Sequence, residues 1–268
     1  MKMKNPEFLP RLSAAALVLP FLFFLMLILS CKNTTESKKT DDSKWQLVFE
    51  EQFDGYNRYV WEQASHTFDY NAAYFRPQNI AYRDGKMVFT LKQEDWQDRH
   101  YTGAELRTSQ YYHYGRYVVR MKAARGSTVV SSFFGFRYNP WQEIDIEFLG
   151  KDTRKIHLNI FYNEGPEGAP NNNNDSSHQS PVVINLDFDA AADFHEYAIE
   201  WEAGSLRWYV DDLLIFASNN PSKVPDLRMQ IMMNLWYSES VGWAGAPDDA
   251  SLPTSAEYDY VRFYQKRE

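Results

Sequence analysis

The sequence predicts an all-β domain, and three observations support this prediction. From Trp45 onward, short segments alternate apolar and polar residues with a period of two, and turn residues separate them. The segments are not interrupted by a long amphipathic helical pattern. Aromatic residues make up 16% of the chain, with 8 Trp, 18 Tyr and 18 Phe, which is more than a core requires. These features predict an antiparallel sandwich or barrel that also presents aromatic side chains to a ligand.

The first 31 residues have the organisation of a targeting segment. Basic residues precede an apolar run over residues 12–29, and this run ends at Cys31. Cys31 is the only cysteine of the chain, so no intrachain disulfide can form. The stretch LILSC, residues 27–31, resembles the lipobox of bacterial lipoproteins, in which Cys31 becomes the lipid-bearing first residue. An uncleaved transmembrane anchor and an ordinary secretory signal are the alternatives.

The remaining chain divides into a tether and one domain. Residues 32–44, KNTTESKKTDDSK, are polar and lack periodicity, which is typical of a flexible linker. We therefore expect a signal peptide at 1–31, a tether at 32–44 and a folded domain at 45–268. This organisation predicts a protein in the bacterial cell envelope, held on the membrane by its lipid. The formal charge of −8 argues against nucleic acid as a partner.

Within the domain, the clear strand patterns follow one another along the chain and are separated by turns. The patterns are KMVFTLKQ (86–93), YGRYVVRMKA (114–123), WQEIDIEF (141–148), KIHLNIFY (155–162), a hairpin around Gly204 within 195–217 with a second turn at Asp211–Asp212, MQIMMNLWY (229–237) and EYDYVRFYQ (257–265). The Asn-, Gly- and Pro-rich segment 163–181 is expected to form a loop at the rim of the domain.

The segment WQEIDIEF places three carboxylates on one face of a strand. Because side chains alternate faces, Glu143, Asp145 and Glu147 share a side with Trp141, and the residues between them point to the core. Neighbouring like charges repel, so ionisation of one acid raises the pKa of the next. Glycoside hydrolysis requires two carboxyl groups in different protonation states, and crowding supplies that difference. An exposed polar face and a calcium site built from clustered carboxylates are the alternatives.

The spacing of these acids also predicts the shape of the sheet. Residues four apart on a flat strand lie about 13 Å apart at a rise of ~3.3 Å per residue. A retaining pair of carboxyl groups should be only about 5–5.5 Å apart. Glu143 and Glu147 can approach each other only if the sheet is concave, so the motif predicts a cleft.

The segment EIDIEFLGKDT, residues 143–153, is similar to the catalytic strand of family 16 glycoside hydrolases, in particular the lichenase (endo-β-1,3-1,4-glucanase) branch. The resemblance extends over YGRYVVRMKAARGSTVVSSFF, FHEYAIEW, RWYVDDLLI, IMMNLW and AEYDYVRFY. It implies a β-jelly-roll sandwich of two curved antiparallel sheets with a concave substrate cleft, and a retaining, endo-acting β-glucanase that needs no catalytic cofactor. It also implies that Glu143 is the nucleophile, Glu147 the general acid/base and Asp145 the residue that tunes the pair.

The resemblance implies further site residues, each with a structural alternative. The substrate contacts implied are Glu105, Arg107, Trp141, Asn159, Phe161, Trp236, Trp243 and Asn71. A salt bridge is the alternative for Glu105 and Arg107, and core packing is the alternative for the tryptophans. Asp259 and Gly85 occupy the places of a structural calcium site, with a carboxylate in a metal-free turn as the alternative.

Two departures from the lichenase pattern leave the substrate open. Phe161 stands where that pattern has Tyr, and His157 stands where it often has Gln. Mixed-linkage β-1,3-1,4-glucan is the expected substrate. A β-1,3-glucanase, a xyloglucan-active hydrolase and a non-catalytic glycan-binding surface lipoprotein are the alternatives. A monomer is expected.

Overall fold

The computed structural model describes residues 42–169 and 176–268, all within the unit Ser37–Glu268. The predicted signal peptide with Cys31 lies outside the described residues, as does the predicted tether up to residue 41. The last three tether residues form a short 3-10 helix, η1 (Asp42–Lys44), and the Lys44 ammonium pairs with the buried Glu200 carboxylate at 3.2 Å. Lys44, the last residue of the predicted tether, therefore contacts the folded domain. Within the described residues, no helix combines the length and the apolar character that crossing a membrane requires.

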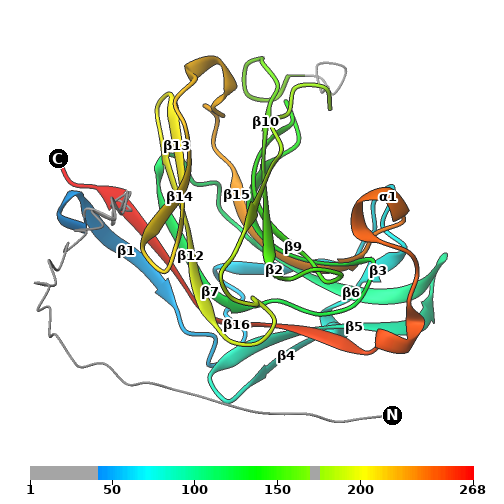
Figure 1. The fold of residues 1–268 in the computed structure, drawn as a ribbon. Helices are drawn as coiled ribbons and strands as arrows, with labels where there is room; N and C mark the ends of the chain where they lie inside the picture. The colour runs from blue at the N-terminus through cyan, green and yellow to red at the C-terminus, as the bar shows by residue number, and fades with distance from the viewer. Residues whose placement is uncertain (1–41, 170–175) are drawn as a thin grey trace, which may run out of the picture. The chain divides into compact units, whose positions relative to one another are not determined.

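Two antiparallel sheets make up the domain (Figure 1). In order across the first sheet lie β4 (Ile80–Arg83), β5 (Lys86–Trp96), β16 (Thr254–Lys266), β7 (Gly115–Lys122), β12 (His195–Glu202), β13 (Ser205–Val210) and β14 (Leu213–Ser218), with β1 (Trp45–Glu51) paired to β16. In order across the second sheet lie β11 (Val182–Asn185), β10 (Lys155–Tyr162), β9 (Gln142–Leu149), β8 (Val129–Arg137), β15 (Gln230–Tyr237), β6 (Arg99–Thr108) and β2 (Trp61–Gln63). The sheets are joined where β5 pairs with β6.

The remaining elements are short. They are β3 (Ala73–Phe75), which runs parallel to β6, the helix α1 (Val241–Ala244), and the 3-10 helices η2 (Pro77–Asn79), η4 (Pro221–Lys223) and η5 (Asp249–Ser251). The all-β prediction is confirmed. The hairpin around Gly204 is present, and both residues of the turn at Asp211–Asp212 have positive φ, 46° and 63°.

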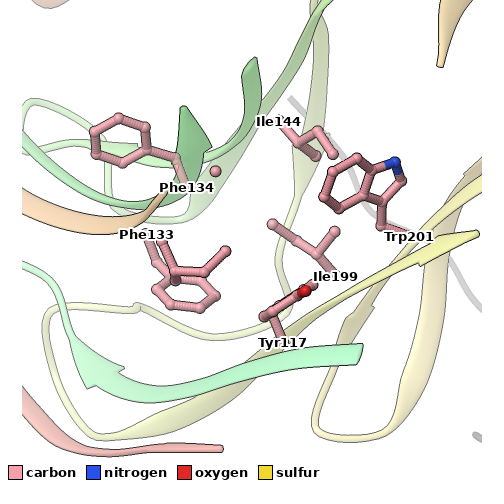
Figure 2. A pocket seen from close by; sticks show the side chains of 8 residues that line it. Tyr117, Phe133, Phe134, Ile144, Ile199 and Trp201 are labelled. Carbon is pink, nitrogen blue, oxygen red and sulfur yellow. The ribbon is translucent and has the colours of Figure 1, made fainter. Parts of the chain in front are cut away.

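The core lies between the two sheets and follows from the period-two patterns. Strand β9 contributes Ile144, Ile146 and Phe148, which are at most 2% exposed, and they pack with inward-facing residues of the first sheet such as Tyr197. A small apolar void of about 10 Å³ remains beside Ile144, lined also by Gly135 and Trp201 (Figure 2). This packing faces one side of β9 and leaves the other side free for polar side chains.

The second sheet is curved. In Figure 1 its strands run steeply near the label of β10 and bend toward α1. Curvature is the property that the acid spacing on β9 requires, since a flat strand would hold Glu143 and Glu147 apart.

Candidate active site

The three acids of β9 lie on the face of the second sheet that is turned away from the core. This surface is called the acid face below. Asp145 is 4% exposed, and Glu143 and Glu147 are half-buried. From the core side, the Trp208 indole N–H donates to the Asp145 backbone carbonyl at 3.2 Å, which fixes the middle of the strand.

Both neighbouring strands extend the acid face in register. On β10, the residues opposite Glu143, Asp145 and Glu147 are Phe161, Asn159 and His157. On β8, the residues opposite the same acids are Phe136, Phe134 and Ser132. Each acid therefore has one neighbour on either side, and together these neighbours are aromatic or polar. The segments 141–148 and 155–162, both expected to be strands, pair with each other in antiparallel orientation.

Trp141 contacts the first acid directly. Its indole N–H donates to Glu143 Oε2 at 2.6 Å. Its ring stacks on Phe161, with centroids 4.3 Å apart and an interplanar angle of 17°. The sequence placed Trp141 in phase with the acids, and the structure brings it against Glu143.

The three carboxyl groups have raised pKa values, chiefly because they are buried. Burial raises the pKa of Glu143 to about 7, although hydrogen bonds from Trp141 and Asp145 favour its ionised form. Burial and the charge of Glu143 raise the pKa of Glu147 to about 8. Burial and the charges of both glutamates raise the pKa of Asp145 well above its ordinary range, so Asp145 is a protonated donor to Glu143. The acids titrate as a group, and the carboxyl groups of Glu143 and Glu147 lose their protons near neutral pH, with pKa values of about 7 and about 8.

A second polar group lies beside Glu147. The Ser132 hydroxyl donates to Asn234 Oδ1, and the Asn234 amide bonds to the Glu105 carboxylate. Glu105 is 3% exposed, and burial raises its pKa to about 7. His66 Nε2 lies 3.4 Å from Glu105 Oε1. A line of polar side chains therefore crosses from Glu147 on β9 to Glu105 on β6.

Arg107 contacts two carboxylates at the far edge of this line. Its Nε lies 3.4 Å from Glu62 Oε2, and its Nη1 lies 3.9 Å from Glu105 Oε1. Both predicted residues, Glu105 and Arg107, face the same side of the sheet as the acids. The salt-bridge alternative and the substrate-contact prediction are compatible, since Arg107 is only partly buried.

Aromatic side chains form a group at the Glu147 end of the acid face. Trp236 packs edge-on against Phe68, with ring centroids 5.1 Å apart, and its ring centroid lies 6.0 Å from that of Trp243. Trp243, on α1, lies edge-on to the ring of His157, with ring centroids 6.4 Å apart. Trp236 is 9% exposed and also packs into a small core cluster, whereas Trp243 is more open.

Two predicted substrate contacts are used by the protein itself. Asn71 is fully buried, and its Oδ1 accepts from the Ala73 backbone at 2.8 Å. Asn159 lies next to Asp145, but its amide donates to Gln179 Oε1 at 3.0 Å and its Oδ1 accepts from the Ser180 backbone at 3.2 Å. Asn159 thus holds the end of the 163–181 loop against β10. Residues 170–175 of that loop lie outside the described residues.

The residues predicted for calcium, Asp259 and Gly85, supply only part of a metal site. The Asp259 carboxylate pairs with Arg120, which leaves its second oxygen for a cation. Gly85 occupies a turn with φ of 65°, beside Asp54. Over residues 42–169 and 176–268, no three His, Cys, Asp or Glu side chains are grouped to hold a metal. A cation at Asp259 would depend on backbone carbonyls and water for its other ligands.

Asn234 and Ser132 are the polar residues of the acid face that the sequence reasoning did not single out. Asn234 is in phase with Trp236 on β15, two residues away, and this alternation was the available signal. Ser132 lies in the segment VVSSFFGF, where it alternates with core residues in the same way. Both become visible only when the order of strands β9, β8, β15 and β6 is known.

The acid face can carry out acid–base chemistry on a ligand that stacks on aromatic rings. One carboxyl group of pKa near 7 is held by hydrogen bonds that favour its anion, and a second of higher pKa stands on the same strand. Such a pair supplies a nucleophile and a proton donor at neutral pH. Flat rings beside both ends of the acid row offer surfaces for sugar rings.

Comparisons with known proteins agree with this chemistry. The family model described as "Glycosyl hydrolases family 16" matches residues 67–262. A β-glucanase of Bacillus subtilis is 36% identical over 250 residues, which cover 90% of this chain and 94% of that protein. A β-glucanase of Acetivibrio thermocellus is 38% identical over 221 residues, and the match spans 79% of this chain but only 61% of that longer protein.

Solved structures show the same similarity. The crystal structure of a prokaryotic β-1,3-1,4-glucanase (lichenase) from a mouse hindgut metagenome has a TM-score of 0.71 and 34% identity, covering 80% of this chain and 97% of that one. The jelly-roll architecture expected from the sequence is confirmed by this match. Because the family model covers most of the domain, acid strand included, the chain belongs to glycosyl hydrolase family 16.

Proposed function

We propose that this protein is a retaining endo-β-glucanase that cleaves mixed-linkage β-1,3-1,4-glucan. The observation that carries the proposal is the pair Glu143 and Glu147 on one strand, with pKa values of about 7 and about 8 and a tuning residue, Asp145, between them. Two carboxyl groups with these properties are what a retaining glycosidase uses.

In the first step, Glu143 is the nucleophile and Glu147 the general acid. The Glu143 carboxylate attacks the anomeric carbon while Glu147 gives its proton to the glycosidic oxygen, so the bond to the leaving sugar breaks and a glycosyl ester forms on Glu143. Trp141 and Asp145 both hydrogen-bond to Glu143, which favours its anion before attack and holds its orientation. The higher pKa of Glu147 fits the residue that must hold a proton.

In the second step, Glu147 acts as general base. Its carboxylate takes a proton from a water molecule, the resulting oxygen attacks the anomeric carbon, and the ester bond to Glu143 breaks. Glu143 returns to its ionised form and Glu147 to its protonated form, with net retention at the anomeric carbon. Only side chains of this chain and water take part, so the reaction requires no cofactor.

The distribution of aromatic rings supports cleavage inside a chain. Trp141 and Phe161 lie at the Glu143 end of the acid row, and Trp243 lies at the Glu147 end beside His157. Sugar rings bound at both ends would place an internal linkage over the acids. The mixed-linkage assignment rests on the lichenase and β-glucanase relatives, which are 34–38% identical.

The test is hydrolysis of a substrate panel by the purified full chain. Release of reducing sugar is measured on barley β-glucan, lichenan, laminarin, xyloglucan and agarose, with Glu143→Gln as the inactive variant. Glu50→Gln is the matched control, because Glu50 of β1 pairs with Arg262 of β16, in the sheet that does not carry the acids. The proposal predicts strong activity on the first two polymers and a loss of at least about 10³-fold in Glu143→Gln. Activity on none of the polymers, or a Glu143→Gln variant as active as Glu50→Gln, would contradict it.

We also propose that Cys31 carries a lipid that anchors the enzyme to a membrane of the cell envelope. The support is the basic and apolar leader that ends in the lipobox-like LILSC. Metabolic labelling with an alkyne fatty acid should mark the wild-type chain and not Cys31→Ala. Equal labelling of both chains would exclude this site of attachment.

We also propose that the Asp259 carboxylate and the Gly85 carbonyl bind a structural calcium ion. The support is the second oxygen of Asp259, the one that the Arg120 pair does not use. Calcium at millimolar concentration should raise the Tm of the wild-type chain and not that of Asp259→Asn. An equal response of both chains would show that calcium acts elsewhere.

A further inference from the structure

A second pocket lies between loop 109–114, strand β1 and the end of β16. Its volume is about 260 Å³, and five of the eleven residues that line it are tyrosines. The tyrosines are Tyr111, Tyr112, Tyr114, Tyr117 and Tyr264. None of the acids of the acid face takes part in this pocket.

The back of the pocket is rigid. Tyr117 and Phe263 are 4% and 1% exposed, and Tyr112 packs edge-on against Phe263, with ring centroids 4.9 Å apart. The Tyr112 backbone exchanges hydrogen bonds of 2.7 and 2.8 Å with Met229. His113 Nε2 contacts the Asp226 carbonyl at 2.9 Å. Preformed walls lower the entropy that a ligand loses on binding.

The mouth of the pocket is open and uncharged apart from one cation. Tyr111 is 46% exposed, and the polar lining is completed by Gln110, His113, Gln265 and Arg228. No Asp or Glu is among the described residues that line it, although the chain as a whole carries −8. Flat rings combined with amide, phenol and guanidinium groups suit a neutral, hydroxyl-rich ligand, because the rings pack on apolar faces and the polar groups meet hydroxyls.

The pocket is separate from the acids but lies on the same strand system. Gln230 of β15 is two strands away from Glu143 through Phe136. Arg228 lies two residues before Gln230, so its Cα is on the order of 12 Å from that of Glu143, from strand spacing and rise alone. Tyr117 and Phe263 of the pocket belong to the core between the sheets, whereas the acids lie on the face turned away from it. Only a polymer long enough to pass around the edge of the sheet can therefore engage both sites, and a short oligosaccharide held at the acids does not need the pocket.

We propose that this tyrosine pocket is a second glycan-binding site, which takes glucosyl units of the polymer and holds it near the acid face. The choice of glucan rests on the proposed function. Its consequence is tighter binding of polymer without any change in the chemistry on short substrates, because two linked contacts raise the effective concentration of the chain.

The experiment compares Tyr111→Ala with Tyr59→Ala in the full chain. Tyr59 is also exposed, at 88%, but does not line the pocket, so it is the matched control. Polymer binding is measured by affinity electrophoresis in barley β-glucan on the Glu143→Gln background. Turnover is measured without that background on a short mixed-linkage oligosaccharide. Tyr111→Phe keeps the ring and serves as the conservative variant.

The proposal expects Tyr111→Ala to weaken polymer binding by about three- to tenfold, the effect of one aromatic contact. Tyr59→Ala and Tyr111→Phe should bind as the parent does, and kcat/KM on the short oligosaccharide should stay within about twofold. Unchanged polymer binding in Tyr111→Ala, or an equal loss on the short substrate, would overturn the second site. Failure of the proposed function would appear differently, as absence of hydrolysis by the wild-type chain.

Discussion

Replacement of Trp141 by Phe separates the two roles that the structure gives this residue. The indole N–H donates to Glu143 Oε2 at 2.6 Å, and the ring stacks on Phe161 at 4.3 Å. Phe retains a flat ring for stacking but has no donor. The variant therefore removes the hydrogen bond that favours the ionised form of Glu143 and keeps most of the aromatic surface.

The magnitude follows from the charge of the acceptor. A hydrogen bond to a charged group contributes about 1.5–3 kcal/mol, and one pKa unit corresponds to about 1.4 kcal/mol. Loss of the Trp141 donor should raise the pKa of Glu143 by about 1–2 units above its value of about 7. Because only the ionised carboxylate attacks, the acid limb of the activity profile should shift to higher pH by the same 1–2 units, about the rise in the pKa of Glu143.

The assay is kcat/KM on barley β-glucan as a function of pH. Below pH 7, Trp141→Phe should lose about 10–100-fold relative to the wild type, since each pKa unit is tenfold in the fraction ionised. Trp243→Phe is the control, because Trp243 lies by His157 and its substitution leaves the hydrogen bond to Glu143 in place. A uniform loss at every pH with an unmoved acid limb would refute the reasoning, since Trp141 would then act by stacking alone.

Three further predictions follow from the same structure. The wild-type profile of kcat/KM should be bell-shaped, with limbs at about pH 7 from Glu143 and about pH 8 from Glu147; limbs below pH 6 would contradict the burial argument. Because the pKa of Glu147 is raised in the folded chain, the unfolded chain loses this proton at a lower pH, and the free energy of unfolding falls as pH rises from about 4.5 to 8. In denaturant unfolding, the free energy of unfolding of Glu147→Gln should therefore exceed that of the wild type by about 1–3 kcal/mol at pH 9 and equal it at pH 4. Gly135→Ala should raise the Tm, because its Cβ would meet Met229 Sδ at 3.4 Å beside the apolar void and an alanine in a strand gains about 0.5–1 kcal/mol over glycine. In Gly103→Ala the Cβ would lie 2.3 Å from the Leu235 carbonyl oxygen, so that variant should lose stability, and equal responses of the two glycines would refute the packing argument.

The strand that carries the acids could be predicted because its pattern is local. In WQEIDIEF the period of two assigns Ile144 and Ile146 to the core and Glu143 and Glu147 to the other face, without knowledge of any neighbour. The pairing with residues 155–162 was equally local, because a short turn joins the two strands. Both features depend on residues close together in the chain.

The rest of the acid face depends on strands that are distant in sequence. Asn234 and Glu105 become neighbours because β15 lies between β8 and β6, and this order is a property of the completed sandwich. A period-two pattern shows which side of its own strand a residue occupies, but it does not show which strand lies next to it. Ser132 was missed for the same reason, since its partner Asn234 is 102 residues away.

Polar residues were the hardest to assign, because the same side chain can serve the fold or a ligand. Asn71 was expected at the substrate, yet its Oδ1 holds the Ala73 backbone in a fully buried position. Asn159, also expected at the substrate, stands beside Asp145, but its side chain binds the end of a long loop. The sequence contains no signal for these hydrogen bonds, because they depend on backbone groups brought close by folding.

The arrangement on β9 implies a conflict between stability and activity that the surrounding structure resolves. Above neutral pH, the fold must hold two or three carboxylates together on one strand, and their raised pKa values are the measure of that cost. Strand β9 is paired along both edges, by β8 and β10, and its opposite face is buried in the core. The backbone is therefore fixed independently of the acids, so their repulsion cannot be relieved by moving the strand apart. Burial, to which the charge of Glu143 adds, therefore raises the pKa of Glu147 and leaves a proton on it, which is the state that Glu147 needs in order to act as an acid.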